Sequence, residues 1–205
     1  MVGREQTAHR GWYLSTYERT KTEGERAALM AAREAEQDVV YVNPSSVQGP
    51  GRYEGNGKLI VNYVNGKLRV FLDTYVSVVD IADTVEGHVL AAERGTPDSR
   101  YVLNGATVPA HEALRIVSEI AGVEHPVRFV APALAHAVAA VGETVARARG
   151  STFSLCRGRM NTFVHGHRYD GSRATRELGL TYTPLEDTFR RTIEWAKAEG
   201  LVTAR

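Results

Sequence analysis

The sequence has one cysteine, no long apolar run and almost no net charge, and each of these features excludes some classes of protein. Cys156 has no second cysteine for an internal disulfide, so a cytoplasmic, reducing location is expected. No apolar run approaches the ~20 residues of a membrane-spanning helix, and the polar first residues do not resemble a secretory signal. The formal net charge is +1, which argues against nucleic acid or a membrane surface as a partner.

The sequence pattern alternates short apolar runs with helical stretches, which predicts an α/β fold. Hydrophobic residues make up 43% of the 205 residues and charged residues 24%, as in ordinary globular domains. Strands are predicted at 39–42, 76–79, 100–103 and 127–130. Helices are predicted at 15–35, 58–64, 80–94, 110–121, 133–148, 171–178 and 184–199. The helix-rich last third suggests a second, smaller lobe.

Two residues of the first predicted helix could carry chemistry together. Tyr17 and Lys21 are four residues apart, so one helical turn places both side chains on the same face. A neighbouring ammonium favours a phenolate over a phenol, and a tyrosine in such a pair can exchange a proton with a carbonyl or alcohol oxygen. A solvated Tyr and Lys on a helix surface is the alternative. Ser15 and Glu18 have the spacing of a capping box at the start of this helix.

The strand that follows this helix leads into a stiff, glycine- and proline-rich segment. Asn43-Pro44 is predicted to stop the strand, which is expected to be buried, and residues 45–57 are predicted to be a loop. Ligands of open α/β sheets bind beyond the carboxyl ends of strands, so this loop could press against a flat ring such as nicotinamide. An ordinary connection rich in turns is the alternative.

Four motifs, in order, resemble the extended short-chain dehydrogenase/reductase family. Tyr17-Glu18-Arg19-Thr20-Lys21 matches its Y-x-x-x-K, and Asn43-Pro44-Ser45-Ser46-Val47-Gln48-Gly49-Pro50-Gly51 is similar to its N-P-[ST]-x-V-x-G-P-G segment. Asp80-Ile81-Ala82-Asp83 resembles the start of a family helix, and residues 169–197 resemble the family's tail. Dihydroflavonol-reductase-like proteins and hopanoid-associated sugar epimerases, which are NAD-dependent epimerases/dehydratases, are the most similar groups.

The resemblance implies a fold, a cofactor and a set of roles. The fold would be the C-terminal portion of a Rossmann-type parallel sheet with a mostly helical substrate lobe, divided as residues 1–105 and 106–205. The activity would be NAD- or NADP-dependent oxidation, reduction or epimerisation of a sugar derivative or another secondary alcohol or ketone. Tyr17 would be the acid/base and Lys21 would bind the nicotinamide ribose. Pro44, Ser45 and Val47 would line the nicotinamide end. Asn43, Gly51 and Arg52, with 58–71, would face the small-molecule substrate.

The family's nucleotide-binding motif, G-x-x-G-x-x-G, does not occur in the residues before Tyr17. Its glycines let the backbone approach a pyrophosphate at a helix N-terminus. Three explanations agree with this absence. They are a truncated gene, an N-terminal half that is encoded separately, and a decayed, non-catalytic remnant that keeps the substrate lobe as a binding module. We favour a truncated gene. The chain by itself is therefore expected not to bind NAD(P) tightly. A homodimer is a further implication of the resemblance.

Other candidate residues carry weaker signals. His165 and His167 lack further ligands at metal-site spacing, so no metal is expected. Arg157, Arg159 and Arg168 could contact a phosphate or could be a solvated loop. Asp80 and Asp83 are expected to cap a helix and order the sheet edge, not to touch substrate.

Overall fold

Helices and strands alternate along the chain in the computed structural model, which describes residues 2–7, 11–53, 56–134 and 168–203. The strands are β1 (Tyr41–Pro44), β2 (Ser46–Gln48), β3 (Val70–Leu72), β4 (Tyr75–Asp80), β5 (Arg100–Leu103), β6 (Ala106–Pro109) and β7 (Arg128–Val130). The helices are α1 (Thr16–Glu34), α2 (Asn56–Val64), α3 (Ile81–Arg94), α4 (Ala110–Ala121), α7 (Ser172–Leu178) and α8 (Leu185–Ala198). The predicted α/β class is confirmed. No helix within the described ranges is long and apolar enough to cross a membrane.

The described strands form small sheets that are mainly parallel. β1 pairs with β5 and β3 pairs with β7, both in parallel. In the third sheet, β4 lies between β2 and β6, parallel to β2 and antiparallel to β6. Parallel pairing fits the helical crossovers between these strands, because parallel strands need a long connection.

The segment that contains β1 and β2 changes its partner strand at Ser45. The Ser45 N–H donates to Leu103 O of β5 at 2.9 Å, and the next residue already pairs with β4. The chain after β5 makes a similar change, since Gly105 N donates to Val78 O at 2.9 Å before β6 pairs with β4. Ser45 therefore lies at the junction between two sheets.

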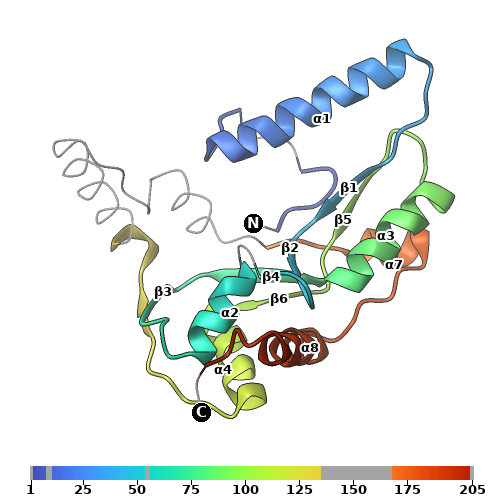
Figure 1. Cartoon of the computed structure of the whole chain (residues 1–205). Helices are drawn as coiled ribbons and strands as arrows, with labels where there is room; N and C mark the ends of the chain where they lie inside the picture. Colours follow the sequence, from blue (N-terminus) through green and yellow to red (C-terminus); the bar gives the residue numbers. More distant parts are fainter. Residues whose placement is uncertain (1, 8–10, 54–55, 135–167, 204–205) are drawn as a thin grey trace.

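Two hydrophobic clusters stabilise the two sides of this junction. One cluster joins α2, α4 and α8 to β4, with the buried residues Ile60, Tyr63, Val64, Val78, Ala113, Ile116, Val117, Leu185, Phe189 and Ile193. The other joins α3, α7 and β5, with Val79, Leu90, Ala91, Tyr101, Leu103, Ala174, Leu178 and Leu180. Figure 1 shows the corresponding helix groups, with α2, α4 and α8 in one and α3 and α7 in the other. The predicted division into domains at about residue 105 stays a prediction, and both clusters draw residues from either side of it.

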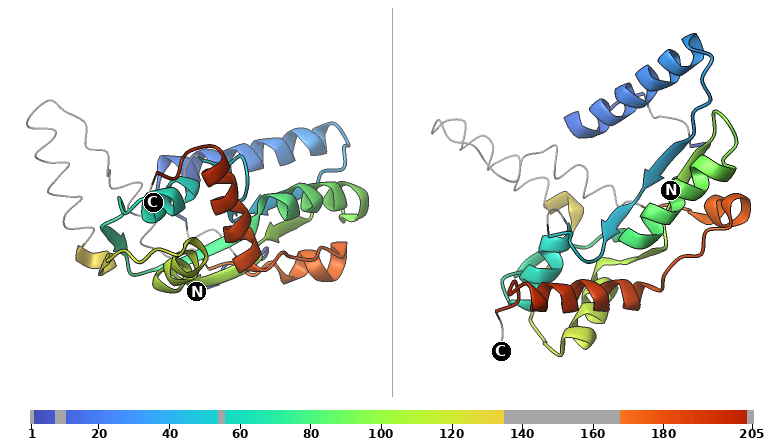
Figure 2. Two further views of the ribbon diagram at one scale, coloured as in Figure 1. Left: turned by 60° about the horizontal axis from the view of Figure 1, so that its bottom comes forward. Right: turned by 45° about the vertical axis from the view of Figure 1, so that its right-hand side comes forward.

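Helix α1 lies apart from both helix groups. In Figure 1 and in the right-hand view of Figure 2 it extends along the side of the molecule opposite α4 and α8. Of its residues only Ala32 is buried. Its position relative to the strands is therefore set by a few polar contacts and not by a packed core.

The strand predictions around residues 39–48 were wrong in detail. β1 begins at Tyr41, includes Asn43 and Pro44 instead of stopping before them, and is half-buried to exposed. Pro44 is tolerated because β1 is an edge strand of its pair. Residues 46–48, predicted as loop, form β2, and β3 and β6 were also not predicted. These strands have three or four residues each and depend on distant partners, which local composition does not reveal.

The helix predictions agree closely with the structure. Asp80 caps α3 by accepting from Ala82 N at 2.8 Å, and Gly122 ends α4 with a φ of 68°. The Asp83 carboxylate accepts from Thr183 N and Thr183 Oγ1, both at 2.7 Å. The cap predicted for Asp80 is thus confirmed, whereas Asp83 orders the segment before α8 and not a sheet edge. The predicted helix 133–148 lies almost entirely outside the described residues.

Gly87 is required where α3 packs on the core. A Cβ at this position would lie 2.6 Å from Leu103 Cδ1 and 3.3 Å from Leu180 Cδ2. We expect Gly87→Ala to lower the free energy of unfolding by about 1–2 kcal/mol, because overpacking outweighs the gain in helix propensity. Urea denaturation measures the change.

Gly24→Ala in α1 is the matched control, since nothing lies within 4 Å of the added Cβ. It should raise α1 stability by about 0.5–1 kcal/mol through helix propensity alone. Equal effects of the two substitutions would contradict the packing described for α3.

Candidate functional site

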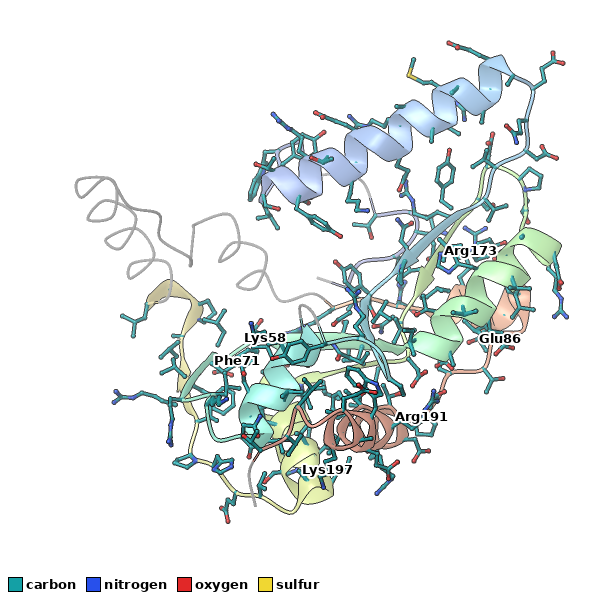
Figure 3. All side chains as sticks on the ribbon, viewed as in Figure 1. Lys58, Phe71, Glu86, Arg173, Arg191 and Lys197 are labelled. Carbon is teal, nitrogen blue, oxygen red and sulfur yellow. The ribbon has the colours of Figure 1, made fainter. Side chains whose placement is uncertain are left out.

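A cavity of about 300 Å³ lies between α1, the β1–β2 junction, β4 and the α2–α4–α8 cluster. The lining residues that carry polar groups are Tyr17, Ser45, Ser46, Gln48, Thr74, Ser77, Tyr75 and Tyr169. Apolar side chains form the rest, namely Pro44, Leu59, Ile60, Phe71, Val76, Val78, Ala110, Ala113, Leu114, Val117 and Phe189. Phe71, labelled in Figure 3, belongs to β3 and lies beside α2, which carries the labelled Lys58. The cavity is thus lined by residues far apart in the sequence.

Tyr17 and Lys21 lie on the same face of α1, as the four-residue spacing predicts. The Lys21 ammonium nitrogen is 5.8 Å from the centroid of the Tyr17 ring. Tyr17 lines the cavity and keeps 68% of its surface exposed. Its side chain is therefore accessible to a ligand that enters from solvent.

The first turn of α1 is held by the predicted cap. Ser15 Oγ accepts from Glu18 N at 3.2 Å, and Glu18 Oε2 accepts from Leu14 N at 2.5 Å. Leu14 is buried beneath this turn. Because Tyr17 belongs to the same turn, the cap fixes where its side chain leaves the helix.

Glu25 attaches the middle of α1 to the sheet. It lies two helical turns after Tyr17 and forms an ion pair with Arg100 of β5. Its second oxygen lies 3.4 Å from Asn43 Nδ2 of β1. Arg100 Nη1 also donates to Glu5 O at 3.4 Å. Residues 17, 21 and 25 therefore share one helix face, and the last of them connects it to the strands.

Two buried oxygens in the cavity wall have no hydrogen-bond partner among the described residues. They are Ser45 Oγ and Gln48 Oε1. Gln48 is 2% exposed, and its Nε2 donates to Ser46 Oγ at 3.1 Å. A buried acceptor without a donor is costly, so such atoms identify positions where a ligand can donate a hydrogen bond.

The structure brings only some of the predicted site residues to the cavity. Tyr17, Pro44 and Ser45 line it together, and so do Leu59, Ile60 and Phe71 of the predicted 58–71 segment. Val47 packs against the cluster around α3 and β5. Asn43 is exposed and lies near Glu25, and Gly51 and Arg52 are exposed and outside the lining. The contacts predicted for these last four residues stay predictions.

Several lining residues were missed by the sequence analysis. Gln48 stood inside a predicted loop, and its burial follows from the pairing of β2 with β4. Tyr169 was noted only as part of the tail motif. Its backbone O accepts from Asn104 Nδ2 at 2.8 Å and its strand bridge to Gly3 places it beside the amino-terminal segment. Val76 and Val78 lie in the strand predicted at 76–79, but burial in β4 is continuous from Ser77 to Asp80, so no period-two pattern indicates which residues face the cavity.

Arg168 and Tyr182 lie close to lining residues but are not part of the lining themselves. The Arg168 guanidinium carbon stacks 3.5 Å from the centroid of the Tyr75 ring. Behind Tyr169, burial raises the pKa of Tyr182 to about 12. The Tyr182 hydroxyl donates to Gly171 O at 3.1 Å and accepts from Asn104 N at 3.3 Å. This phenol therefore stays neutral and structural.

No cluster of three or more His, Cys, Asp or Glu side chains that could hold a metal occurs within the described part of the chain. His165, His167, Cys156, Arg157 and Arg159 lie outside the described residues, so the structure does not address them.

The Glu25–Arg100 ion pair should determine how tightly α1 is held against the sheet. We expect Glu25→Gln to loosen α1 by about 1 kcal/mol, because a partly buried ion pair is replaced by a weaker neutral contact. Amide hydrogen exchange should then be roughly fivefold faster in α1 and unchanged in α8.

Glu23→Gln is the control for this substitution. Glu23 is exposed and its only described ion pair is with Arg19 at 3.9 Å in the same helix. Exchange rates in α1 that rise equally in both variants would show that Glu25 does not anchor the helix.

Comparison with known proteins finds relatives of similar sequence, although no protein-family profile matches the chain. A putative dihydroflavonol 4-reductase of Synechocystis sp. is 28% identical over 195 residues, which cover 92% of this chain and 57% of that protein. The sterol demethylase protein B of Methylococcus capsulatus is 28% identical over 91% of this chain and 58% of that protein. The chain thus spans less than two thirds of the length of these relatives.

Solved structures show the same fold. A nucleoside-diphosphate-sugar epimerase from Pseudomonas aeruginosa superposes with a TM-score of 0.80 and 26% identity, over 99% of this chain and 63% of that one. A UDP-glucuronic acid 4-epimerase from Bacillus cereus, solved with NAD, has a TM-score of 0.71 at 16% identity, over 97% of this chain and 57% of that one. The relatives and structural neighbours are therefore NAD-dependent epimerases/dehydratases and dihydroflavonol-reductase-like members of the extended short-chain dehydrogenase/reductase family, matched over a length consistent with their carboxy-terminal part.

Proposed function

We infer that this chain forms the substrate-side part of an NAD(P)-dependent oxidoreductase or epimerase that acts on a secondary alcohol or its ketone. The observation that supports this most is the presence of Tyr17, Pro44 and Ser45 on one cavity wall, with the Lys21 ammonium beside the Tyr17 ring. These residues come from two segments that only the fold brings together. A sugar derivative remains one of the proposed substrates.

The chain's own contribution to the reaction is to bind the reacting oxygen and to move its proton. In the reducing direction, the Tyr17 hydroxyl donates its proton to the carbonyl oxygen as that oxygen becomes an alcohol. In the oxidising direction, the same oxygen of Tyr17 accepts the alcohol proton. The Lys21 ammonium nitrogen, 5.8 Å from the centroid of the Tyr17 ring, puts a positive charge beside the proton-transfer group in both directions.

The residues at the junction fit the nicotinamide end of a cofactor. Ser45 Oγ is buried without a described partner, so it can hydrogen-bond an incoming polar group. Pro44 offers a flat apolar surface next to it, and we propose that Lys21, on the same helix face as Tyr17, binds a ribose hydroxyl. When bound there, a nicotinamide would supply or accept the hydride that balances the Tyr17 proton.

The pyrophosphate of the cofactor needs residues beyond these. The 205 residues contain no G-x-x-G-x-x-G motif, and we propose that a further segment or a separate polypeptide carries this part of the site. A homodimer is a second proposed assembly. A non-catalytic binding module is the alternative function, and it is favoured by the fact that the cavity is lined by this chain's own residues.

Removal of the Tyr17 hydroxyl tests the proposed activity. In an assembly that contains the pyrophosphate-binding part, Tyr17→Phe should lower ketone-dependent NAD(P)H oxidation by roughly 10²–10⁴-fold, because the proton donor is lost while the ring remains. The measurement is the rate of NAD(P)H absorbance loss.

Tyr53→Phe is the control, since Tyr53 is outside the cavity lining and stacks near Lys58 instead. A Tyr17→Phe assembly that oxidises NAD(P)H as fast as the Tyr53→Phe assembly would refute the assigned role of Tyr17.

The isolated chain should bind the cofactor poorly. We expect a dissociation constant for NADPH weaker than about 100 µM, because the nicotinamide end contributes only a small part of the binding free energy. Fluorescence titration of NADPH with the 205-residue chain measures it. Submicromolar binding would show that these residues hold the pyrophosphate by a route other than the glycine motif.

A further inference from the structure

We propose that the cavity binds a compact, uncharged ring compound that carries a hydroxyl group in addition to its reacting ketone or alcohol. This inference rests on the proposed function for the identity of the reacting group. It goes further by selecting an apolar ring ligand over a nucleotide sugar and by assigning Gln48 as the residue that recognises the second hydroxyl.

The composition of the wall is the first argument. No acidic or basic side chain lines the cavity among the described residues. Leu59, Phe71, Val76, Leu114 and Phe189 instead give it an apolar surface over most of its extent. Burial of apolar ligand surface there is favourable, whereas burial of a phosphate or a polyhydroxylated sugar would leave polar groups without partners.

The size of the cavity is the second argument. Its volume of about 300 Å³ is at the low end of the range for small-molecule sites. A ligand of two or three fused rings fills such a space, while a nucleoside diphosphate sugar would leave most of its atoms outside. A ligand of that size would contact mainly apolar side chains.

The unpartnered acceptor is the third argument. Gln48 is 2% exposed, and its Nε2 is already used in the bond to Ser46 Oγ at 3.1 Å. Its Oε1 is left without a hydrogen-bond partner among the described residues. A site built with a buried acceptor favours a ligand that donates to it, because a ligand without a donor leaves the acceptor unpaired.

Arg168 is a described cation in contact with a lining residue, and it could favour an anionic ligand. Its guanidinium stacks on the Tyr75 ring at 3.5 Å, outside the lining itself. The guanidinium is thus engaged by a lining ring and is not part of the lining itself. An anion held by Arg168 would therefore bind outside the lining residues named above.

Equilibrium dialysis of the isolated, full-length chain tests the proposal without any cofactor. The probes are 9-fluorenone, 2-hydroxy-9-fluorenone and UDP-glucose. We expect the hydroxylated ketone to bind about fivefold more tightly than 9-fluorenone, since one neutral hydrogen bond separates them, and UDP-glucose to bind more weakly than both. Gln48→Leu should abolish the difference between the two ketones.

Two further variants test whether the ketones bind in the cavity or elsewhere on the surface. Leu59→Asp should weaken both ketones by roughly tenfold or more, because it adds a charge to the apolar wall. Leu134→Asp is the matched control, since Leu134 is 56% exposed and outside the lining, and it should change neither. If Gln48→Leu fails to fold, as judged by circular dichroism, Leu59→Asp still tests whether the ketones bind in the cavity.

Two results would overturn the proposal. One is tighter binding of UDP-glucose than of either ketone, especially if Arg168→Gln abolishes it. The other is ketone binding that is absent or is unaffected by Leu59→Asp. Neither result depends on hydride transfer, so the proposed function stands or fails separately, on the Tyr17→Phe assay.

Discussion

Residues 43–48 pair with two different strands, and the cavity forms where the partner changes. Up to Pro44 the segment follows β5, and from Ser46 it follows β4. The strands separate at this point, so Ser45 faces a space that neither sheet fills. The burial of Gln48 depends on the second pairing, and the nearness of Pro44 to α1 depends on the first. A shift of one residue in either register would move Ser45 out of the wall.

The second requirement of the site is the position of a helix that has almost no core of its own. α1 carries Tyr17 and Lys21, yet only Ala32 of its residues is buried. Its cap at Ser15 and the Glu25–Arg100 ion pair therefore determine how far Tyr17 lies from the junction. A helix attached by polar contacts can move more easily than one packed into a core, which suits a wall that must admit a ligand. Arg173 of α7, labelled in Figure 3, also contacts β5, because its Nη1 donates to the backbone O of Arg100 at 3.1 Å.

The sequence was most informative where local chemistry decides the structure. The caps at Ser15 and Asp80 and the Tyr17–Lys21 spacing follow from neighbouring residues, and the structure agrees with them. The burial of Gln48 and the lining by Tyr169 arise from pairing between distant segments, so no local pattern indicates them. Pro44 and the glycine-rich composition after it suggested a loop, and tertiary pairing overrode that preference. The Val47 side chain packs against the cluster around α3 and β5, and its contact with a cofactor, which the resemblance implies, stays a prediction.

The central claim is that Tyr17 faces the same ligand space as residues from β4 and the tail segment. Nuclear magnetic resonance of the chain with ¹³C-labelled tyrosine, titrated with 2-hydroxy-9-fluorenone, tests this directly. The ring signals of Tyr17, Tyr75 and Tyr169 should shift together with one dissociation constant, while that of Tyr53 stays in place. A titration in which Tyr75 and Tyr169 respond and Tyr17 does not would contradict the account, because the proton donor would then lie outside the ligand site.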